Sequence, residues 1–301
     1  MSTSSRSLVL AASDVQVSSK IGGEIVVTTG AKKLAIKVPP SEEETMNVLL
    51  KEVVPKICRS IPMSNQISKE EFLLLEPYVD QLIEAGILLP VAAKVTSEPT
   101  RQLYTYLARR SAKVDSIYEG TQNKMFYIEA PESIALKWRA MLLDQGLMVA
   151  DSPRRAFAII KVYSSESEIL KDSTNFHDDK RRWVPVQFNT SEIIIGPWVS
   201  PGESACPACN AARNTTEQQP STPCSSWLSR QPSSLTWIGG ILAAQALRAV
   251  TPIGPYHPWG TVVIADVLKF EQKKISVWKN PYCRNCADVK SPQAAWSEYY
   301  G

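Results

Sequence analysis

Histidine is scarce in this chain of 301 residues, which contains only His177 and His257. This scarcity argues against a site built on histidine acid–base chemistry or on histidine metal ligands. No segment has the P-loop spacing that cradles nucleotide phosphates. A long apolar run is also missing, because the longest stretch, from Leu235 to Val250, is too short to span a bilayer.

The chain also lacks a strong excess of either charge. It has 33 basic and 30 acidic side chains and a net charge of +3, so composition predicts neither a nucleic-acid-binding stripe nor an acidic tail. Its first residues do not have the charged and apolar regions of a secretory signal. We therefore expect a reducing, cytoplasmic setting. An apolar content of 44% suffices for the cores of two domains.

Cysteine is present in an informative arrangement. Four of the six cysteines form two C-x-x-C pairs, Cys206 with Cys209 and Cys283 with Cys286. This spacing lets both thiolates of a pair reach one tetrahedral ion, and two pairs complete a closed zinc site with no position for chemistry. Two alternatives remain: disulfides, which need an oxidising compartment, and a redox pair, which would explain one C-x-x-C but not both.

Alternating or β-branched apolar residues predict three strands near the N-terminus, over residues 14–20, 24–29 and 34–38. Three short helices are predicted to follow them. Ser41 with Glu44, and Ser68 with Glu71, have the spacing of capping boxes, and the third helix ends at Gly86.

This order of elements resembles the PqqD-like leader-peptide recognition element of enzymes that make peptide natural products, as does the helix end at Leu82–Leu89. The resemblance implies that a leader peptide adds as a strand beside the third strand and packs on the third helix, which is β-augmentation. The residues implied to line this groove are Lys33, Leu34, Ala35, Ile36, Lys37, Val38, Tyr78, Leu82 and Ile83.

Two other interpretations of this region stay open: a winged helix that binds DNA, and a purely structural wing. A DNA-binding helix would be basic. The stretch from Glu76 to Glu84 instead carries three carboxylates and no Lys or Arg, which argues against nucleic acid.

Strands and helices alternate in the rest of the chain, which predicts an α/β sheet with crossover connections. The run from Ile195 to Cys209 is similar to a stretch in the ThiF and ubiquitin-activating class, and more closely to their relatives in thiazole/oxazole-modified peptide pathways. The apolar helix at 235–250, the strand at 261–266 and the stretch Asn280–Cys286 extend the resemblance over most of residues 125–290.

One segment departs from adenylating members of that class. They carry a glycine-rich phosphate loop after the first strand, whereas the corresponding segment here, Glu129–Ala135, has no glycine. Glu129 and Glu132 would repel a triphosphate, and Pro131 removes a backbone donor. We therefore expect that this chain binds no ATP.

The resemblance implies an N-terminal winged-helix-like domain at residues 1–95 and a degenerate ThiF-like, Rossmann-type α/β zinc domain at residues 96–301. It also implies a non-catalytic subunit that binds a precursor's leader and presents its core to a YcaO-type, ATP-dependent cyclodehydratase. The chain ends fifteen residues after Cys286, so we expect no large catalytic domain in it.

The partners implied are the YcaO-type subunit, the leader peptide, a second copy of the chain and, as a further candidate, a flavin-dependent azoline oxidase. Neither nucleic acid nor membrane is expected. The alternatives are a ThiF-type ATP-dependent adenylating enzyme acting on a peptide, and a zinc-containing transcription regulator.

Overall fold

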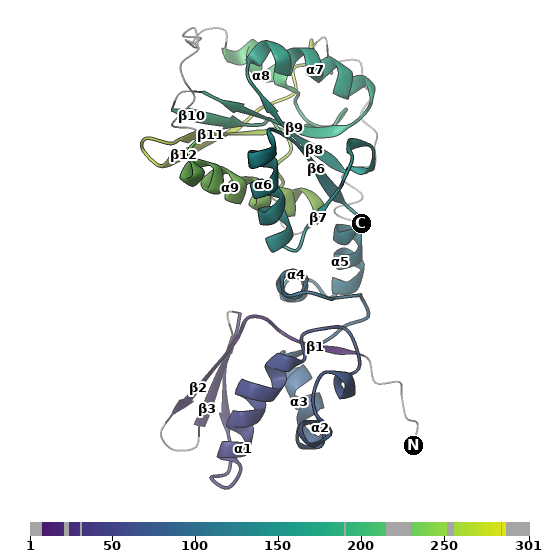
Figure 1. The fold of residues 1–301 in the computed structure, drawn as a ribbon, viewed down its shortest axis with the longest axis vertical. Helices are drawn as coiled ribbons and strands as arrows, with labels where there is room; N and C mark the ends of the chain where they lie inside the picture. The colour runs from purple at the N-terminus through teal and green to yellow at the C-terminus, as the bar shows by residue number, and fades with distance from the viewer. Residues whose placement is uncertain are drawn as a thin grey trace. The chain divides into compact units, whose positions relative to one another are not determined.

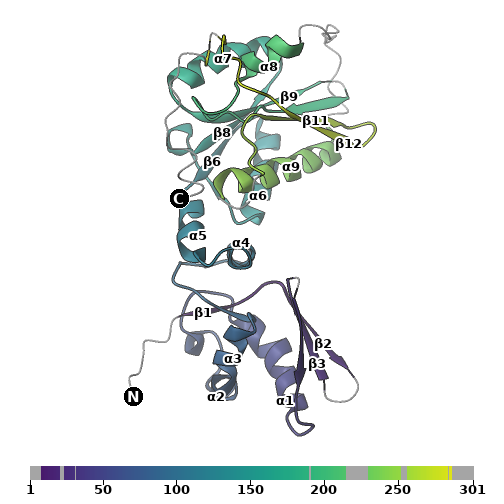
Figure 2. The same cartoon turned by 180° about the vertical axis from the view of Figure 1, so that it is seen from behind.

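The computed structural model describes residues 8–20, 24–30, 32–189, 191–214, 230–251, 256–283 and 285–286. The chain divides into two compact units, Met1–Gly120 (unit 1) and Thr121–Gly301 (unit 2). Figures 1 and 2 show their elements from opposite sides. None of the described helices is both long and apolar enough to cross a bilayer.

The division at Gly120 lies further along the chain than the boundary that we predicted at residue 95. Helix α4 (Glu98–Ala108) belongs to unit 1, because Thr105 within it and Arg109 after it bind Ser13 and Asp14 of the N-terminal segment. The Ser13 amide donates to Thr105 Oγ1 at 3.1 Å. The Arg109 guanidinium donates to both carboxylate oxygens of Asp14, from Nη2 at 2.8 Å and from Nε at 3.0 Å.

Unit 1 contains the three strands predicted from the alternation, paired antiparallel in the order β2-β3-β4. A two-stranded sheet of β1 and β5 was not predicted, because three residues are too few to show a period. The strands are β1 (Val9–Ala11), β2 (Val15–Lys20), β3 (Glu24–Thr29), β4 (Lys32–Lys37) and β5 (Leu88–Pro90). The hairpin glycines, Gly22 and Gly23, lie outside the described residues.

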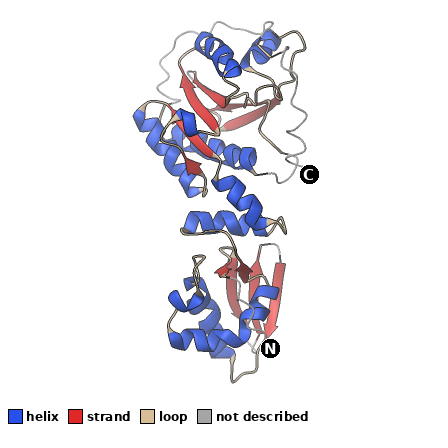
Figure 3. Cartoon of the chain, turned by 90° about the vertical axis from the view of Figure 1, so that its right-hand side faces the viewer, coloured by secondary structure: helices blue, strands red, loops and turns tan. Residues whose placement is uncertain are grey.

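The first three helices of unit 1 pack on the inner face of the three-stranded sheet, and all helices are shown in blue in Figure 3. Helix α1 continues through a π-helical turn at Leu49–Val53 and a 3₁₀ turn at Val54–Lys56. The others follow in chain order: α1 (Glu43–Val48), α2 (Lys69–Leu75), α3 (Val79–Glu84), α4 and α5 (Val114–Gln122).

One of the two predicted capping boxes is confirmed. At the start of α2, the Glu71 amide donates to Ser68 Oγ at 3.2 Å and the Ser68 amide donates to Glu71 Oε2 at 2.8 Å. The box at Ser41 is wrong, because α1 begins at Glu43 and Glu42 is its cap residue, without a side-chain cap bond. The Pro39 carbonyl accepts a hydrogen bond from the Glu42 amide at 2.9 Å. This turn occupies residues 39–42, so the helix begins only after it.

Unit 2 is a mixed α/β fold around a seven-stranded sheet of order β12-β11-β10-β9-β8-β6-β7. The strands β7, β6, β8 and β9 are parallel, and β9 to β12 are antiparallel neighbours. They are β6 (Met125–Glu129), β7 (Met148–Val149), β8 (Ala158–Tyr163), β9 (Arg182–Phe188), β10 (Glu192–Ile195), β11 (Thr261–Asp266) and β12 (Glu271–Ser276).

Helices cover both faces of this sheet, as Figures 1 and 2 show. Helices α6 and α9 lie on one face, and α7 and α8 on the other. Their bounds are α6 (Glu132–Asp144), α7 (Glu166–Asp178), α8 (Pro207–Asn214) and α9 (Pro232–Val250). All eight tryptophans of the sequence fall in unit 2, and three of the largest fully buried side chains are Trp138, Trp183 and Trp198.

Helices α6 and α9 approach each other closely at Gly239. A Cβ there would clash with Met141 Sδ and would lie 2.8 Å from Cδ1 of Trp138, whereas a Cβ on Gly240 would meet nothing within 4 Å. The close approach of the two helices therefore depends on Gly239 and not on Gly240.

Candidate functional sites

The two cysteine pairs meet in unit 2, although 77 positions separate Cys206 from Cys283. Cys206 lies just before α8 and Cys209 in its first turn, while the second pair follows β12. Each pair is closed by a tight turn, since the Cys209 amide donates to the Cys206 carbonyl at 3.0 Å and the Cys286 amide to the Cys283 carbonyl at 3.3 Å. All four side chains are buried.

The four sulfurs are arranged as a tetrahedral ion requires. All lie within 4.8 Å of one another, with Sγ–Sγ distances of 3.8 Å for Cys206–Cys209, 3.6 Å for Cys206–Cys283 and 3.3 Å for Cys209–Cys286. A zinc–sulfur bond of about 2.3 Å sets the edge of a sulfur tetrahedron at about 3.8 Å. The cluster could therefore hold a metal of this kind.

The surroundings of the cluster favour a thiolate at Cys209, whereas its hydrogen bonds and burial raise the pKa of Cys286. The Cys206 thiol donates to Cys209 Sγ, and this hydrogen bond lowers the pKa of Cys209. The backbone amide of Asn280 donates to the same sulfur at 3.3 Å. An amide that donates to a ligand sulfur helps to orient that sulfur towards the metal, although the amide does not contact the metal itself.

A second cluster of charged side chains lies where the parallel strands β6 and β8 end. The Lys161 ammonium contacts Glu129 Oε1 at 2.7 Å and Asp172 Oδ2 at 2.8 Å. Tyr163 Oη donates to the same Asp172 oxygen at 3.0 Å. Glu129 and Lys161 are direct cross-strand neighbours, and Asp172 comes from α7.

The pKa values in this cluster show that the charges stabilise one another. Burial lowers the pKa of Lys161, but hydrogen bonds and charge from Asp172 and Glu129 outweigh it and raise that pKa above its usual value. Burial alone would raise the pKa of Asp172, yet the Lys161 and Tyr163 contacts lower it. Burial, followed by the charge of Asp172, raises the pKa of Tyr163. These directions keep Lys161 and Asp172 ionised and Tyr163 neutral at neutral pH.

This network occupies the position at which open α/β sheets bind ligands. The chain runs from β6 to β7 on one side and then to β8 on the other, so the strand order reverses between β6 and β8. The helix that begins there, α6, has Pro131 as its cap residue and Glu132 in its first turn. The sequence indicated the glutamates, but it gave no reason to single out Lys161 and Asp172. The only available signal was a lysine within the apolar strand β8.

In unit 1, the residues implied for peptide binding lie on both faces of β4, directly after β4, and on or just before α3. Lys33, Ala35 and Lys37 are exposed, whereas Leu34 and Ile36 are half-buried and face the helices. Among the remaining four, Val38 and Leu82 are buried in the core, while Tyr78 and Ile83 are half-buried against it. The Tyr78 hydroxyl donates to Glu42 Oε2 at 3.4 Å, which brings the start of α3 close to the segment that follows β4.

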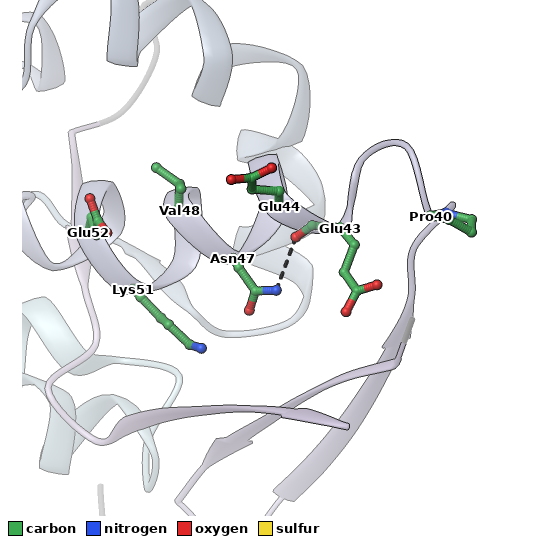
Figure 4. A pocket seen from close by; sticks show the side chains of 7 residues that line it. All are labelled: Pro40, Glu43, Glu44, Asn47, Val48, Lys51 and Glu52. Atoms are coloured by element: carbon green, nitrogen blue, oxygen red, sulfur yellow. Dashed lines mark hydrogen bonds between the residues drawn. The ribbon is translucent and has the colours of Figure 1, made fainter. Parts of the chain in front are cut away.

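Two hollows of unit 1 lie along α1 and its continuation. The larger, about 490 Å³, is lined by one face of α1 and by Pro40, and Figure 4 shows Glu43, Asn47 and Lys51 pointing to the same side of the helix. The smaller, about 260 Å³, lies between β2 and the π-helical turn, with Val15 and Val17 among its lining residues. Sequence reasoning did not anticipate either hollow.

Comparisons with known proteins give matches of structure only. No family model matches the sequence, and no curated protein does. A structure described as the heterocyclase TruD superimposes on 94% of this chain with a TM-score of 0.57 and 16% identity. A heterocyclase in complex with substrate and cofactor covers 93% with a TM-score of 0.61 and 14% identity. E. coli MccB with succinimide covers 93% with a TM-score of 0.51 and 10% identity.

The chain shares its fold with these heterocyclases and with MccB. The predicted resemblance to proteins of microcin and azole-peptide biosynthesis is thereby confirmed at the level of the fold. The extent of the match differs between the two kinds of relative, because the chain spans 43% and 39% of the heterocyclase chains but 99% of the MccB chain.

Proposed function

We propose that this chain is the non-catalytic, leader-binding subunit of a cytoplasmic peptide cyclodehydratase. The observation that carries the proposal is a heterocyclase fold over almost the whole chain, combined with a charged network at the switch point of its sheet. Glu129 and Asp172 place negative charge where the phosphates of a nucleotide would lie. In this role the rest of a heterocyclase, with ATP-dependent chemistry, comes from a YcaO-type partner.

Unit 1 supplies the peptide-binding step in this proposal. The leader adds as a strand to β4, where Ile36, Tyr78 and Ile83 are half-buried and accessible to a peptide side chain. Leu82 supports this groove from within the core and does not contact the peptide. Holding the leader raises the local concentration of the core at the partner, which can strengthen a second contact by a factor on the order of 10² or more.

The cysteine cluster holds zinc in this proposal, as its four buried sulfurs suit that ion. A zinc with four sulfur ligands has no open position, so it stabilises unit 2 and takes no part in the reaction. A second copy of the chain and a flavin-dependent azoline oxidase complete the proposed set of partners.

One assay separates this function from the strongest alternative. Released ADP would be measured with precursor, with the YcaO-type subunit and with this chain, alone and together. We expect no nucleotide turnover by this chain alone, and turnover by the partner that rises when the chain and precursor are added. No stimulation of the partner would contradict the proposal.

The alternative, a ThiF-type enzyme that adenylates a peptide, draws support from the match over the full length of MccB. It requires that the chain alone exchange pyrophosphate into ATP when a peptide is present. The start of α6 argues against this activity, because Pro131 has no amide to donate and Glu132 adds negative charge where phosphate would bind.

A further inference from the structure

The sheet of unit 1 has two edges, and the proposed leader site uses only one of them. Among the described residues, β2 and β4 each pair with β3 alone. The two edges differ in charge. Strand β4 carries Lys32, Lys33 and Lys37, which restrict the strands that can add to it, whereas the sequence of β2 has one lysine, Lys20, at its end. Strand β2 is thus the less protected edge.

The side chains of β2 alternate in a way that suits a bound strand. Val15 and Val17 are half-buried and line the smaller hollow, while Gln16 and Ser18 on the opposite face are exposed. The hollow's other wall includes Leu50 from the helical continuation of α1. A strand added to β2 would place every second side chain over this apolar floor, since side chains along a strand alternate between its faces.

The two hollows adjoin along the helix, because Lys51 lines both. Glu43 and Glu44 lie at the far end of the larger hollow, and Figure 4 shows Glu43, Asn47 and Lys51 on one side of α1. We call the two hollows together the β2–α1 groove. It has acidic side chains at Glu43, Glu44 and Glu52, basic ones at Lys51 and Arg101, and an apolar floor, so it can select a peptide by its charged and apolar side chains.

We propose that the β2–α1 groove binds a second extended stretch of the precursor peptide, which adds as a strand to β2. Alternate apolar side chains of this stretch lie over Val15 and Val17. A basic side chain lies near Glu43 and Glu44, and an acidic one near Lys51. The inference rests on the proposed function, because the occupant is the same precursor, and a peptide held at both edges of one sheet binds more tightly than at either edge alone.

The test measures, by fluorescence anisotropy, the affinity of the full chain for its labelled precursor peptide. Val17→Lys places a charge in the apolar hollow, and Gln16→Lys adds the same charge to the exposed face of the same strand. Lys51→Glu reverses the charge at an exposed helix position. We expect Val17→Lys and Lys51→Glu each to weaken binding tenfold or more, and Gln16→Lys to change it less than twofold.

Strand β4 provides the comparison, through Ile36→Lys with Ala35→Lys as its exposed control. If the two edges bind separate stretches, the losses from Val17→Lys and Ile36→Lys multiply in the double variant. Normal affinity in Val17→Lys and Lys51→Glu, with binding lost in Ile36→Lys, would overturn the β2–α1 groove and leave the proposed function intact. A wild-type chain with no affinity for the precursor would overturn both. If Val17→Lys fails to fold, Lys51→Glu alone decides.

Discussion

At the scale of single residues, the cysteine cluster leads to a prediction about metal content and stability. Cys283→Ser replaces one of the four buried sulfurs that could hold a metal, and the remaining three cannot close a four-sulfur site. We expect bound zinc to fall from about one ion per chain to well below half. The free energy of unfolding of unit 2 should fall by roughly 3 kcal/mol or more, since metal binding contributes to folding.

Cys58→Ser is the matched control, because Cys58 is a free cysteine in unit 1. Elemental analysis and denaturant titration of both variants would check the prediction. Equal metal content in the two variants would count against the metal site.

Lys161 is the second residue whose substitution is informative. In Lys161→Met, the carboxylates of Glu129 and Asp172 lose their shared cation and face each other. We expect a loss of about 1–2 kcal/mol at pH 7, since the group is only partly buried.

The loss in Lys161→Met should depend on pH in a definite direction. The folded-state pKa of Asp172 is lowered, so its contribution is present above the unfolded value near 3.8 and is lost as pH falls through the folded value. The wild type therefore loses more stability on acidification than the variant, and the difference between the two narrows below about pH 4. Urea titrations at pH 7 and at lower pH would measure this, and a constant difference would contradict the assignment.

At the scale of elements, the contact between α6 and α9 separates two adjacent glycines. Gly239→Ala places a methyl group against the buried Trp138 ring, which is fixed by a 2.9 Å hydrogen bond from its Nε1 to the Leu235 carbonyl. We expect a loss of about 1–3 kcal/mol. Gly240→Ala is the control: its methyl group meets open space, and alanine favours a helix by up to about 1 kcal/mol over glycine. Thermal unfolding of the two variants should move in opposite directions.

Elements with a clear period were predictable from the sequence, and those without one were not. Strand β2 alternates, β3 is rich in β-branched residues, and α9 is largely apolar. Helix α7 and strand β12 were missed because their sequences are mostly polar. Strand β12 is an edge strand and α7 covers the sheet with few apolar residues, so tertiary contacts and not local pattern define them.

The candidate sites divide in the same way. Spacing along the chain was enough to pair Cys206 with Cys209 and Cys283 with Cys286, because each pair is local. The contact of Lys161 with Asp172 requires β8 and α7 to be placed, and the β2–α1 groove requires the packing of a helix against a sheet edge. Neither leaves a signal at fixed spacing.

At the scale of the whole molecule, the division into two units predicts separable responses to metal removal. All four cysteine ligands lie in unit 2, and the sheet edges proposed for peptide binding lie in unit 1. We expect a chelator to speed amide hydrogen exchange across β10 to β12 and α8 while exchange in β2 to β4 stays unchanged. Precursor affinity should change less than twofold. Equal acceleration in both units would show that the fold does not divide in this way.

The uneven distribution of tryptophan gives the chain an intrinsic optical label. Because every indole belongs to unit 2 and unit 1 has none, light emitted by these rings reports on unit 2 alone. Peptide capture and loss of metal can then be followed separately in one cuvette, the first through a dye on the peptide and the second through the protein's own emission.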